Sequence, residues 1–173
     1  MCSKPSQADC RIVRLRRRDP ELLASLDELH REFIHAPASS ASSVRTATGS
    51  PPPPEQFLDF VTERLDDEAM LLIFALVGDT PVGYSLAFDV SQHPFMPEWK
   101  RAGYVTQMFV LPQHRRQGIG QRLFDFIVRW LRSREVTSLL LNVSVDNPDA
   151  ERFWRKQGFV PHLVRMRREI TAA

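Results

Sequence analysis

The chain has 173 residues, with 23 basic and 21 acidic side chains, a net charge of +2 and 43% hydrophobic residues. This length suffices for one domain with a hydrophobic core, and the balanced charge does not indicate nucleic-acid binding. No apolar run approaches the roughly 18 residues that a membrane span needs. The two cysteines, Cys2 and Cys10, fit neither a disulfide framework nor a metal site.

The N-terminal residues 1–10 are polar and contain no apolar signal core. We therefore expect a disordered tail at 1–10, a single domain over residues 11–173 and a cytoplasmic location. Apolar and basic residues alternate from Ile12 to Leu15, which predicts the first strand. The arginines at 16–18 are interpreted as a solvated strand end rather than as a nucleic-acid contact.

Two amphipathic helices are expected next, separated by a loop. Asp19, Pro20 and Glu21 form a helix start, because an N-cap, a first-turn proline and a first-turn acid each favour it. Residues 37–54 are rich in proline, serine and alanine. They predict a mobile loop, since such a segment buries too little apolar surface to offset the entropy of ordering it. The expected inward faces of the two helices consist of Leu22, Leu23, Leu26, Leu29, Phe33, Phe57, Val61 and Leu65.

Two strands, Met70–Val77 and Val82–Val90, are expected to pair as a hairpin, because a Gly-Asp-Thr-Pro turn separates the two apolar runs. An irregular loop at 91–101 follows them. A further apolar strand is expected at 137–145, and the last strand at 159–170. Between these two, the sequence predicts a helix that begins after Asn147 and Pro148 and ends before Gly158.

The segment from 104 to 131 is the most informative part of the chain. A strand at 104–111 is followed by a basic turn with Gly118 and Gly120, and then by apolar residues spaced as on one face of a helix, namely Ile119, Leu123, Phe126, Ile127, Trp130 and Leu131. The first amides of a helix lack intrahelical partners and carry partial positive charge. Because the two glycines let a ligand approach the backbone, the turn predicts an anion site suited to phosphate.

The residues after the turn exclude two common phosphate-binding loops. The loop of nucleotide hydrolases needs a lysine and a hydroxyl residue where this chain has Gln121 and Arg122. A dinucleotide-binding fingerprint needs a small residue where this chain has Leu123.

Two segments resemble motifs of the GCN5-related N-acetyltransferase (GNAT) family. The first is the pattern Arg115-x-x-Gly118-x-Gly120 between a strand and an amphipathic helix. The second, residues 147–159, is similar to the Asn-x-x-Ala-x-x-Phe-Tyr-x-x-x-Gly-Phe segment of that family. The order of expected elements over residues 11–170 resembles the family as well. The resemblance implies an α/β (α+β) fold with a mixed, mostly antiparallel sheet of about six strands flanked by four helices.

The resemblance also implies acetyl-CoA as co-substrate. Backbone groups of Phe109 and Val110 should bind the pantetheine arm, where the strand separates from its neighbour. Arg115 opens the motif and is expected to brace the turn. Asn147 should contact the cofactor arm near its thiol end, or cap its helix, and both roles are open. The residues expected around the pyrophosphate are Arg116, Gln117, Gly118, Gly120 and Gln121.

The expected reaction is acetyl transfer to an amine by direct attack in a ternary complex, without a metal. The attacking amine must lose a proton, and the Val110 amide is the candidate donor to the oxyanion. The family often has a glutamate base where this chain has Gln107, and a tyrosine acid where it has Trp154. We assign Gln107 and Val110 to catalysis, with Gln107 holding a water that relays the proton, and Trp154 to the cofactor site. Further acid or base candidates are Tyr84, His93 and Tyr104.

The acceptor is expected to be a primary amine of a small molecule or a peptide. In the family the first two helices cover the acceptor site, and residues 55–68 of this chain hold six acids and one arginine. This charge suits a cationic amine, although a solvated helix face has the same composition. Phe95 and Trp99 are candidates for the opposite wall of the pocket.

The alternative function is a CoA-binding sensor or interaction module that has lost catalysis, because the usual base and acid are replaced. No nucleic-acid or membrane partner is expected. A homodimer is left open: dimers are common in the family, and the strand expected at 159–170 is a candidate edge for a second subunit. No residue specifies the interface or the identity of the amine.

Overall fold

The computed structural model describes residues 10–36, 52–91, 101–164 and 166. Within these ranges, five strands form one sheet in the order β1-β2-β3-β4-β5. Neighbouring strands are antiparallel, except for β4 and β5, which are parallel. The elements are β1 (Cys10–Leu15), α1 (Pro20–His35), α2 (Pro54–Glu63), β2 (Met70–Val77), β3 (Thr80–Asp89), β4 (Ala102–Val110), the 3-10 helix η3 (Pro112–His114), α3 (Ile119–Arg132), β5 (Ser138–Leu141) and α4 (Pro148–Lys156).

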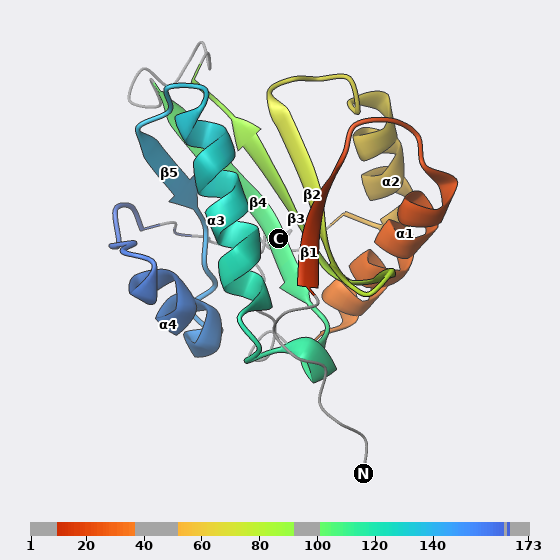
Figure 1. Ribbon diagram of the computed structural model, residues 1–173. Helices are drawn as coiled ribbons and strands as arrows, with labels where there is room; N and C mark the ends of the chain where they lie inside the picture. The colour runs from red at the N-terminus through yellow and green to blue at the C-terminus, as the bar shows by residue number, and fades with distance from the viewer. Residues whose placement is uncertain (1–9, 37–51, 92–100, 165, 167–173) are drawn as a thin grey trace, which may run out of the picture.

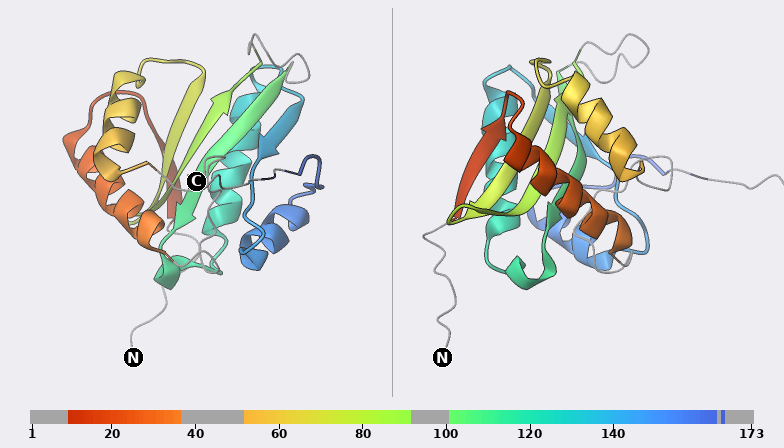
Figure 2. Two further views of the ribbon diagram at one scale, coloured as in Figure 1. Left: turned by 180° about the vertical axis from the view of Figure 1, so that it is seen from behind. Right: turned by 90° about the vertical axis from the view of Figure 1, so that its right-hand side faces the viewer.

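Helices cover both faces of the sheet (Figure 1, Figure 2). Helices α1 and α2 lie on one face, α3 crosses the other, and α4 lies beside α3 on the β5 side. A hydrophobic cluster fills each interface, and β2 contributes to both. Leu72 and Phe74 face α1 and α2, while Leu71 and Ile73 face α3, because successive side chains of a strand point to opposite faces. Burial on both sides explains why β2 is an unbroken apolar run.

The expected mixed, mostly antiparallel sheet with flanking helices is therefore confirmed. Local helix signals are confirmed as well. The Asp19 side chain accepts hydrogen bonds from the Glu21 and Leu22 amides and caps α1. Asn147 caps α4 by accepting from the Ala150 amide, and Gly158 follows the helix with a φ of 88°, the left-handed conformation that commonly ends a helix.

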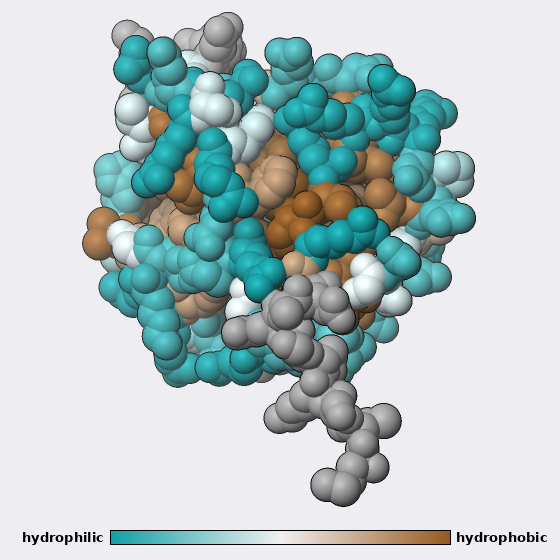
Figure 3. All heavy atoms as spheres, viewed as in Figure 1, coloured by the Kyte–Doolittle hydropathy of each residue, from teal (hydrophilic) through white to brown (hydrophobic). Residues whose placement is uncertain are grey.

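Helix α3 shows how the sequence period sets the packing. Its buried residues lie on one face, and hydrophilic side chains cover much of the outer surface around it, with hydrophobic ones visible between them (Figure 3). Phe126, expected on the inner face, is only half-buried, and Phe124 is buried instead. The buried residues are Ile119, Leu123, Phe124, Ile127, Trp130 and Leu131.

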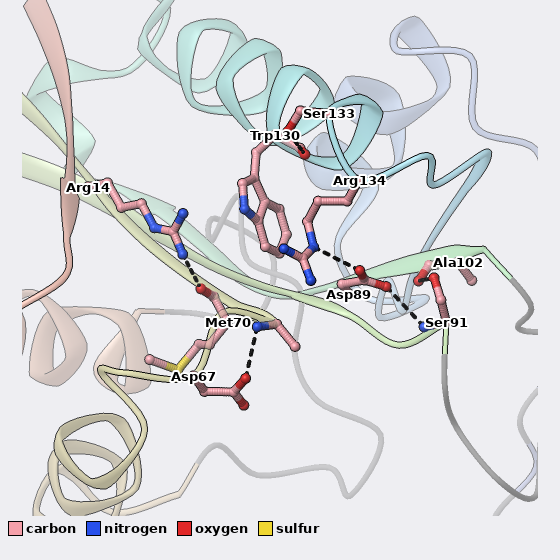
Figure 4. A network of polar contacts seen from close by, with 10 residues as sticks. Arg14, Asp67, Met70, Asp89, Ser91, Ala102, Trp130, Ser133 and Arg134 are labelled. Carbon is pink, nitrogen blue, oxygen red and sulfur yellow. Dashed lines mark hydrogen bonds and ion pairs between the residues drawn. The ribbon is translucent and has the colours of Figure 1, made fainter.

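A polar network joins the end of α3 to the sheet (Figure 4). Arg134 Nε donates to one carboxylate oxygen of Asp89 at 2.8 Å, and the Ser91 amide donates to the other at 3.1 Å. Burial alone would raise the pKa of Asp89, but these hydrogen bonds outweigh it, so the pKa lies below its usual value. The guanidinium groups of Arg14 and Arg134 lie 5.7 and 5.5 Å from the ring centroid of Trp130. Because Trp130 is 9% exposed, it offers no platform for stacking bases.

The C-terminal part of the chain differs from expectation. The strand expected at 159–170 is absent from its described residues, 159–164 and 166, and β5 is shorter than the expected 137–145. Among the described residues, β5 lies at the edge of the sheet and pairs only with β4. The apolar side chains that suggested this strand are instead exposed: Val160, Leu163, Val164 and Met166.

One other expected boundary is corrected by the structure, and three expected segments cannot be compared with it. Cys10, expected in the tail, is the first residue of β1. The remaining tail residues 1–9, residues 37–51 of the expected mobile loop, and residues 92–100 with His93, Phe95 and Trp99 lie outside the described part of the chain. Among the described residues, no helix is long and apolar enough to cross a membrane.

Candidate active site

The end of β4 lies at a gap in the sheet. Its register with β5 ends at the pair Val105 and Leu141, whereas its register with β3 continues to Val110. The β3–β4 register shifts at this point, which leaves Thr106 as an extra residue in β4. Such a bulge bends a strand. The segment from Thr106 to Val110 therefore has one backbone edge that β5 does not pair.

The basic turn follows directly. Arg115 Nε donates to the Val110 carbonyl oxygen at 2.9 Å, which ties the turn to the end of the strand. Arg116 has a φ of 60° and Gly118 a φ of 79°, so two residues of the turn are left-handed. Left-handed residues in a turn direct successive amides to one side and form a concave anion site. A non-glycine residue pays a steric cost in this conformation, which makes Arg116 a strained position.

Helix α3 begins at this turn without a side-chain cap, because Gly118 is its N-cap residue. The first amides of the helix consequently have no intrahelical acceptor. At Gly120, an added Cβ would lie 3.5 Å from the Phe153 ring, which is an ordinary contact. Packing alone therefore does not require glycine at position 120.

The end of β4, η3, the start of α3 and α4 meet at one end of the molecule (Figure 1). They line a cleft of about 270 Å³. Four cationic side chains and one acid face this cleft, namely Arg115, Arg116, Arg152, Lys156 and Asp149. Asp149 forms ion pairs with two of these cations, at 2.7 Å from Arg152 and 3.8 Å from Arg116. The cleft thus combines unpaired backbone groups with a net positive charge, an arrangement that suits a phosphorylated ligand with an extended arm.

The structure brings together part of the expected site. The expected residues that line the cleft are Val110, Arg115, Arg116, Gly118, Gly120 and Gln121. Gln117 is beside it and donates from Nε2 to the Gln113 carbonyl oxygen. Phe109 directs its side chain into the opposite cluster under α1 and α2, and its backbone carbonyl oxygen lies toward Gly83 of β3 rather than toward the gap.

The remaining expected residues are buried rather than cleft-lining. Gln107 is 2% exposed, and the Tyr84 hydroxyl lies 2.8 Å from its Oε1 atom. Asn147 is buried as the α4 cap. Trp154 packs against Phe124 and Phe159, and its Nε1 atom is buried without a hydrogen-bond partner in the described residues. A buried orphan donor of this kind is unusual.

Sequence reasoning missed several residues of the cleft. On α4, Asp149, Arg152, Phe153 and Lys156 recur with helical spacing on one face, so the helix prediction contained the signal that they act together. Which structure this face meets depends on how α4 packs, and the sequence does not supply that. The other missed residues are Met108, His114 and Ile119. In the described ranges, no cluster of three or more metal-binding side chains is present.

Comparison with known proteins assigns the family. The model of the acetyltransferase (GNAT) family matches residues 27–159, well over half of the chain. The chain belongs to this family. The glycine turn and residues 147–159, the two segments that resembled GNAT motifs, both fall within the matched residues. No curated protein matches the chain by sequence.

Solved structures share the GNAT fold at low sequence identity. An aminoglycoside acetyltransferase, meta-AAC0020, from an uncultured soil metagenomic sample is 16% identical, with a TM-score of 0.68 over 95% of this chain and 98% of the other. AAC(6')-Iy in complex with the bisubstrate analogue CoA-S-monomethyl-acetylneamine is 15% identical, with a TM-score of 0.70 over 93% and 99%. AAC(6')-IG from Acinetobacter haemolyticus is 17% identical, with a TM-score of 0.68 over 93% and 99%.

Proposed function

We propose that this GNAT protein transfers the acetyl group of acetyl-CoA to a primary amine of a small molecule or a peptide. The observation that carries the proposal is the cleft, in which an unpaired strand edge, an uncapped helix start and four cationic side chains meet. CoA has a matching set of features: an arm with amide groups, a pyrophosphate and a 3′-phosphate. Support also comes from AAC(6')-Iy, a protein of the same fold that was solved with a CoA-bearing analogue.

The pyrophosphate is assigned to the glycine turn. Arg116 to Gln121 supply amides around the two left-handed residues, and Arg116 adds charge. Glycine at 118 suits the positive φ. Glycine at 120 is not demanded by the Phe153 contact, so we assign its lack of a side chain to ligand approach.

The pantetheine arm is assigned to the gap beside β4. Amide and carbonyl groups of the arm would pair with the free edge near Phe109 and Val110, as a further strand would. Arg152 and Lys156 on α4 also line the cleft. We assign them to the 3′-phosphate, because the glycine turn already satisfies the pyrophosphate.

Acyl transfer makes three demands on the protein. The amine must lose a proton, the carbonyl oxygen gains negative charge, and a thiolate departs. The Val110 amide on the unpaired edge is the candidate donor to the oxygen. Trp154 Nε1 is the candidate hydrogen-bond donor near the thiolate, which would give its orphan N–H a partner. An indole does not supply a proton, but a thiolate of CoA is a good leaving group, so positioning carries most of the expected rate.

The acceptor is proposed to be cationic. Glu55, Asp59 and Glu63 are exposed on α2 with a spacing of four, which places them on one face. Several proteins of the same fold are aminoglycoside acetyltransferases, and an aminoglycoside carries several cationic amines. An acidic face steers such a ligand, and its effect depends on ionic strength.

The test separates an enzyme from a CoA-binding sensor. Acetyl-CoA is supplied with a panel of amines (an aminoglycoside, a polyamine and a peptide with a free N-terminus), and release of the CoA thiol is followed. We expect the CoA thiol to be released only when an amine of one of these classes is present. Binding of acetyl-CoA without amine-dependent release would support the sensor, which the replaced base and acid positions, Gln107 and Trp154, favour.

A further inference from the structure

A chain of buried polar groups connects α1 to β4. His30 on α1 and Tyr84 on β3 are both 0% exposed, and Gln107 on β4 is 2% exposed. His30 Nδ1 lies 3.0 Å from the Tyr84 hydroxyl, which lies 2.8 Å from Gln107 Oε1. The other ring nitrogen, Nε2, lies 3.0 Å from the Pro52 carbonyl oxygen. His30 also stacks on Phe57 with 4.0 Å between ring centroids, so its orientation is fixed.

Counting the protons of His30, Tyr84 and Gln107 determines which group donates and which accepts in each of these hydrogen bonds. The Pro52 carbonyl can only accept, so Nε2 carries a proton. A neutral imidazole has a single N–H, which leaves Nδ1 as an acceptor. The Tyr84 hydroxyl must then donate to Nδ1, and its one proton is no longer available for Gln107. The Tyr84 oxygen can accept only from the Gln107 amino group, which requires a half-turn of the amide that exchanges Oε1 and Nε2.

The neutral form of His30 is the one that this environment favours. Burial lowers the pKa of His30, and the Pro52 carbonyl, Asp27 and Gln107 only partly oppose it. Arg31 adds to the lowering and is itself paired with Asp27 at 2.9 Å. The other ionisable group in contact, Tyr84, keeps its proton because burial raises its pKa well above the usual value.

We propose that His30 and Tyr84 are positioning residues for acetyl transfer: this directed chain of hydrogen bonds holds the Gln107 amide with its carbonyl oxygen as the free end. That oxygen can accept a hydrogen bond from an N–H of the attacking amine or from an O–H of the water that takes its proton, whereas an amino group in its place could only donate. The inference rests on the proposed function, because it gives a role in acetyl transfer to Gln107, which occupies the usual position of the catalytic base. It explains why a helix of the acceptor side carries a buried histidine.

The first test determines the direction of these hydrogen bonds in the wild-type protein. Ring nitrogen chemical shifts from ¹⁵N-histidine labelling at pH 7.5 identify the tautomer of His30, with His30→Gln used for assignment. We expect a proton on Nε2 alone. A proton on Nδ1 alone, or on both nitrogens, would leave the Tyr84 proton for the Gln107 carbonyl and would overturn the proposal.

The second test reads positioning through kinetics. Tyr84→Phe removes the hydroxyl, and Ser133→Ala is the matched control, because it removes one neutral hydrogen bond, from the Ser133 hydroxyl to the Trp130 carbonyl oxygen, away from the cleft. We expect Tyr84→Phe to lower kcat about tenfold, the effect of one neutral hydrogen bond, while the KM for acetyl-CoA stays unchanged. The control should stay within twofold of the wild type. A folded Tyr84→Phe protein with wild-type kcat would refute the positioning role.

The two proposals fail in different ways. Stabilisation by acetyl-CoA in a thermal melt tests the proposed function without involving His30 or Tyr84. If acetyl-CoA binds and amines are acetylated, but Tyr84→Phe is fully active, only the positioning role is wrong. The tautomer itself is measured in the wild-type protein, and His30→Gln serves only to assign the His30 signals.

Discussion

Removing the two cations of α4 should weaken acetyl-CoA binding through its 3′-phosphate. Arg152 and Lys156 are exposed side chains that face the cleft. An exposed ion pair is worth about 0.5–1 kcal/mol, so the double substitution to alanine should cost about 1–2 kcal/mol and raise the KM for acetyl-CoA roughly 5- to 30-fold. The KM for the amine and kcat should change little, because both cations are assigned to the 3′-phosphate and not to the reacting atoms.

The assay compares acetyl-CoA with acetyl-dephospho-CoA at two salt concentrations. The rise in KM caused by the double substitution should vanish with acetyl-dephospho-CoA. It should also be smaller at ~1 M salt, where the screening length falls to about 3 Å. Arg155→Ala is the matched control, because Arg155 lies on the same helix but pairs with Glu151 at 2.8 Å and does not line the cleft. An unchanged KM for acetyl-CoA in the double variant would refute the assignment of Arg152 and Lys156 to the 3′-phosphate. An equal rise in KM for acetyl-CoA and acetyl-dephospho-CoA would instead indicate that these cations bind the pyrophosphate.

Three further variants test Gln107, the acidic face of α2 and the Arg134–Asp89 ion pair. Gln107→Ala should lower kcat about tenfold with little change in the KM for acetyl-CoA; an unchanged rate would remove Gln107 from the mechanism. Lysine at Asp59 and Glu63 should raise the KM for a cationic amine in low salt only, and an unaltered KM would count against steering. Arg134→Ala should cost about 1 kcal/mol of unfolding free energy. Since Asp89 has a lowered pKa in the folded state, its stabilising effect is complete above the unfolded pKa of ~3.9. The wild type should therefore lose its advantage over Arg134→Ala as the pH falls through the folded pKa of Asp89, and a pH-independent difference in urea unfolding would contradict this.

The parts of the site that sequence reasoning predicted are those set by local chemistry. Gly118 and Gly120 between an apolar strand and an amphipathic helix predicted the turn, because positive φ and uncapped helix amides are local properties. Asn147 and Gly158 predicted both ends of α4 for the same reason.

The parts that it missed depend on contacts between distant segments. His30 was left out of the buried face of α1 because a histidine is buried only with partners, and Tyr84 lies 54 residues away. The cations of α4 were missed because only the packing of that helix directs them to the glycine turn. The strand expected at 159–170 followed from an apolar pattern, but a strand also needs a hydrogen-bonded partner, and among the described residues β5 at the edge of the sheet pairs only with β4.

The central claim is that the glycine turn binds acetyl-CoA, and a thermal melt with acetyl-CoA tests it most directly. At about 100 times its dissociation constant, a ligand adds about 2.7 kcal/mol, which corresponds to a rise in Tm of roughly 5–10 °C. Gly118→Glu should abolish this rise by bulk and charge. Gly158→Glu is the matched control: its φ of 88° imposes similar strain, and it lies outside the cleft. We predict a rise for the wild type and for Gly158→Glu, and none for Gly118→Glu. No rise in the folded wild type, or an equal rise in all three proteins, would contradict the claim.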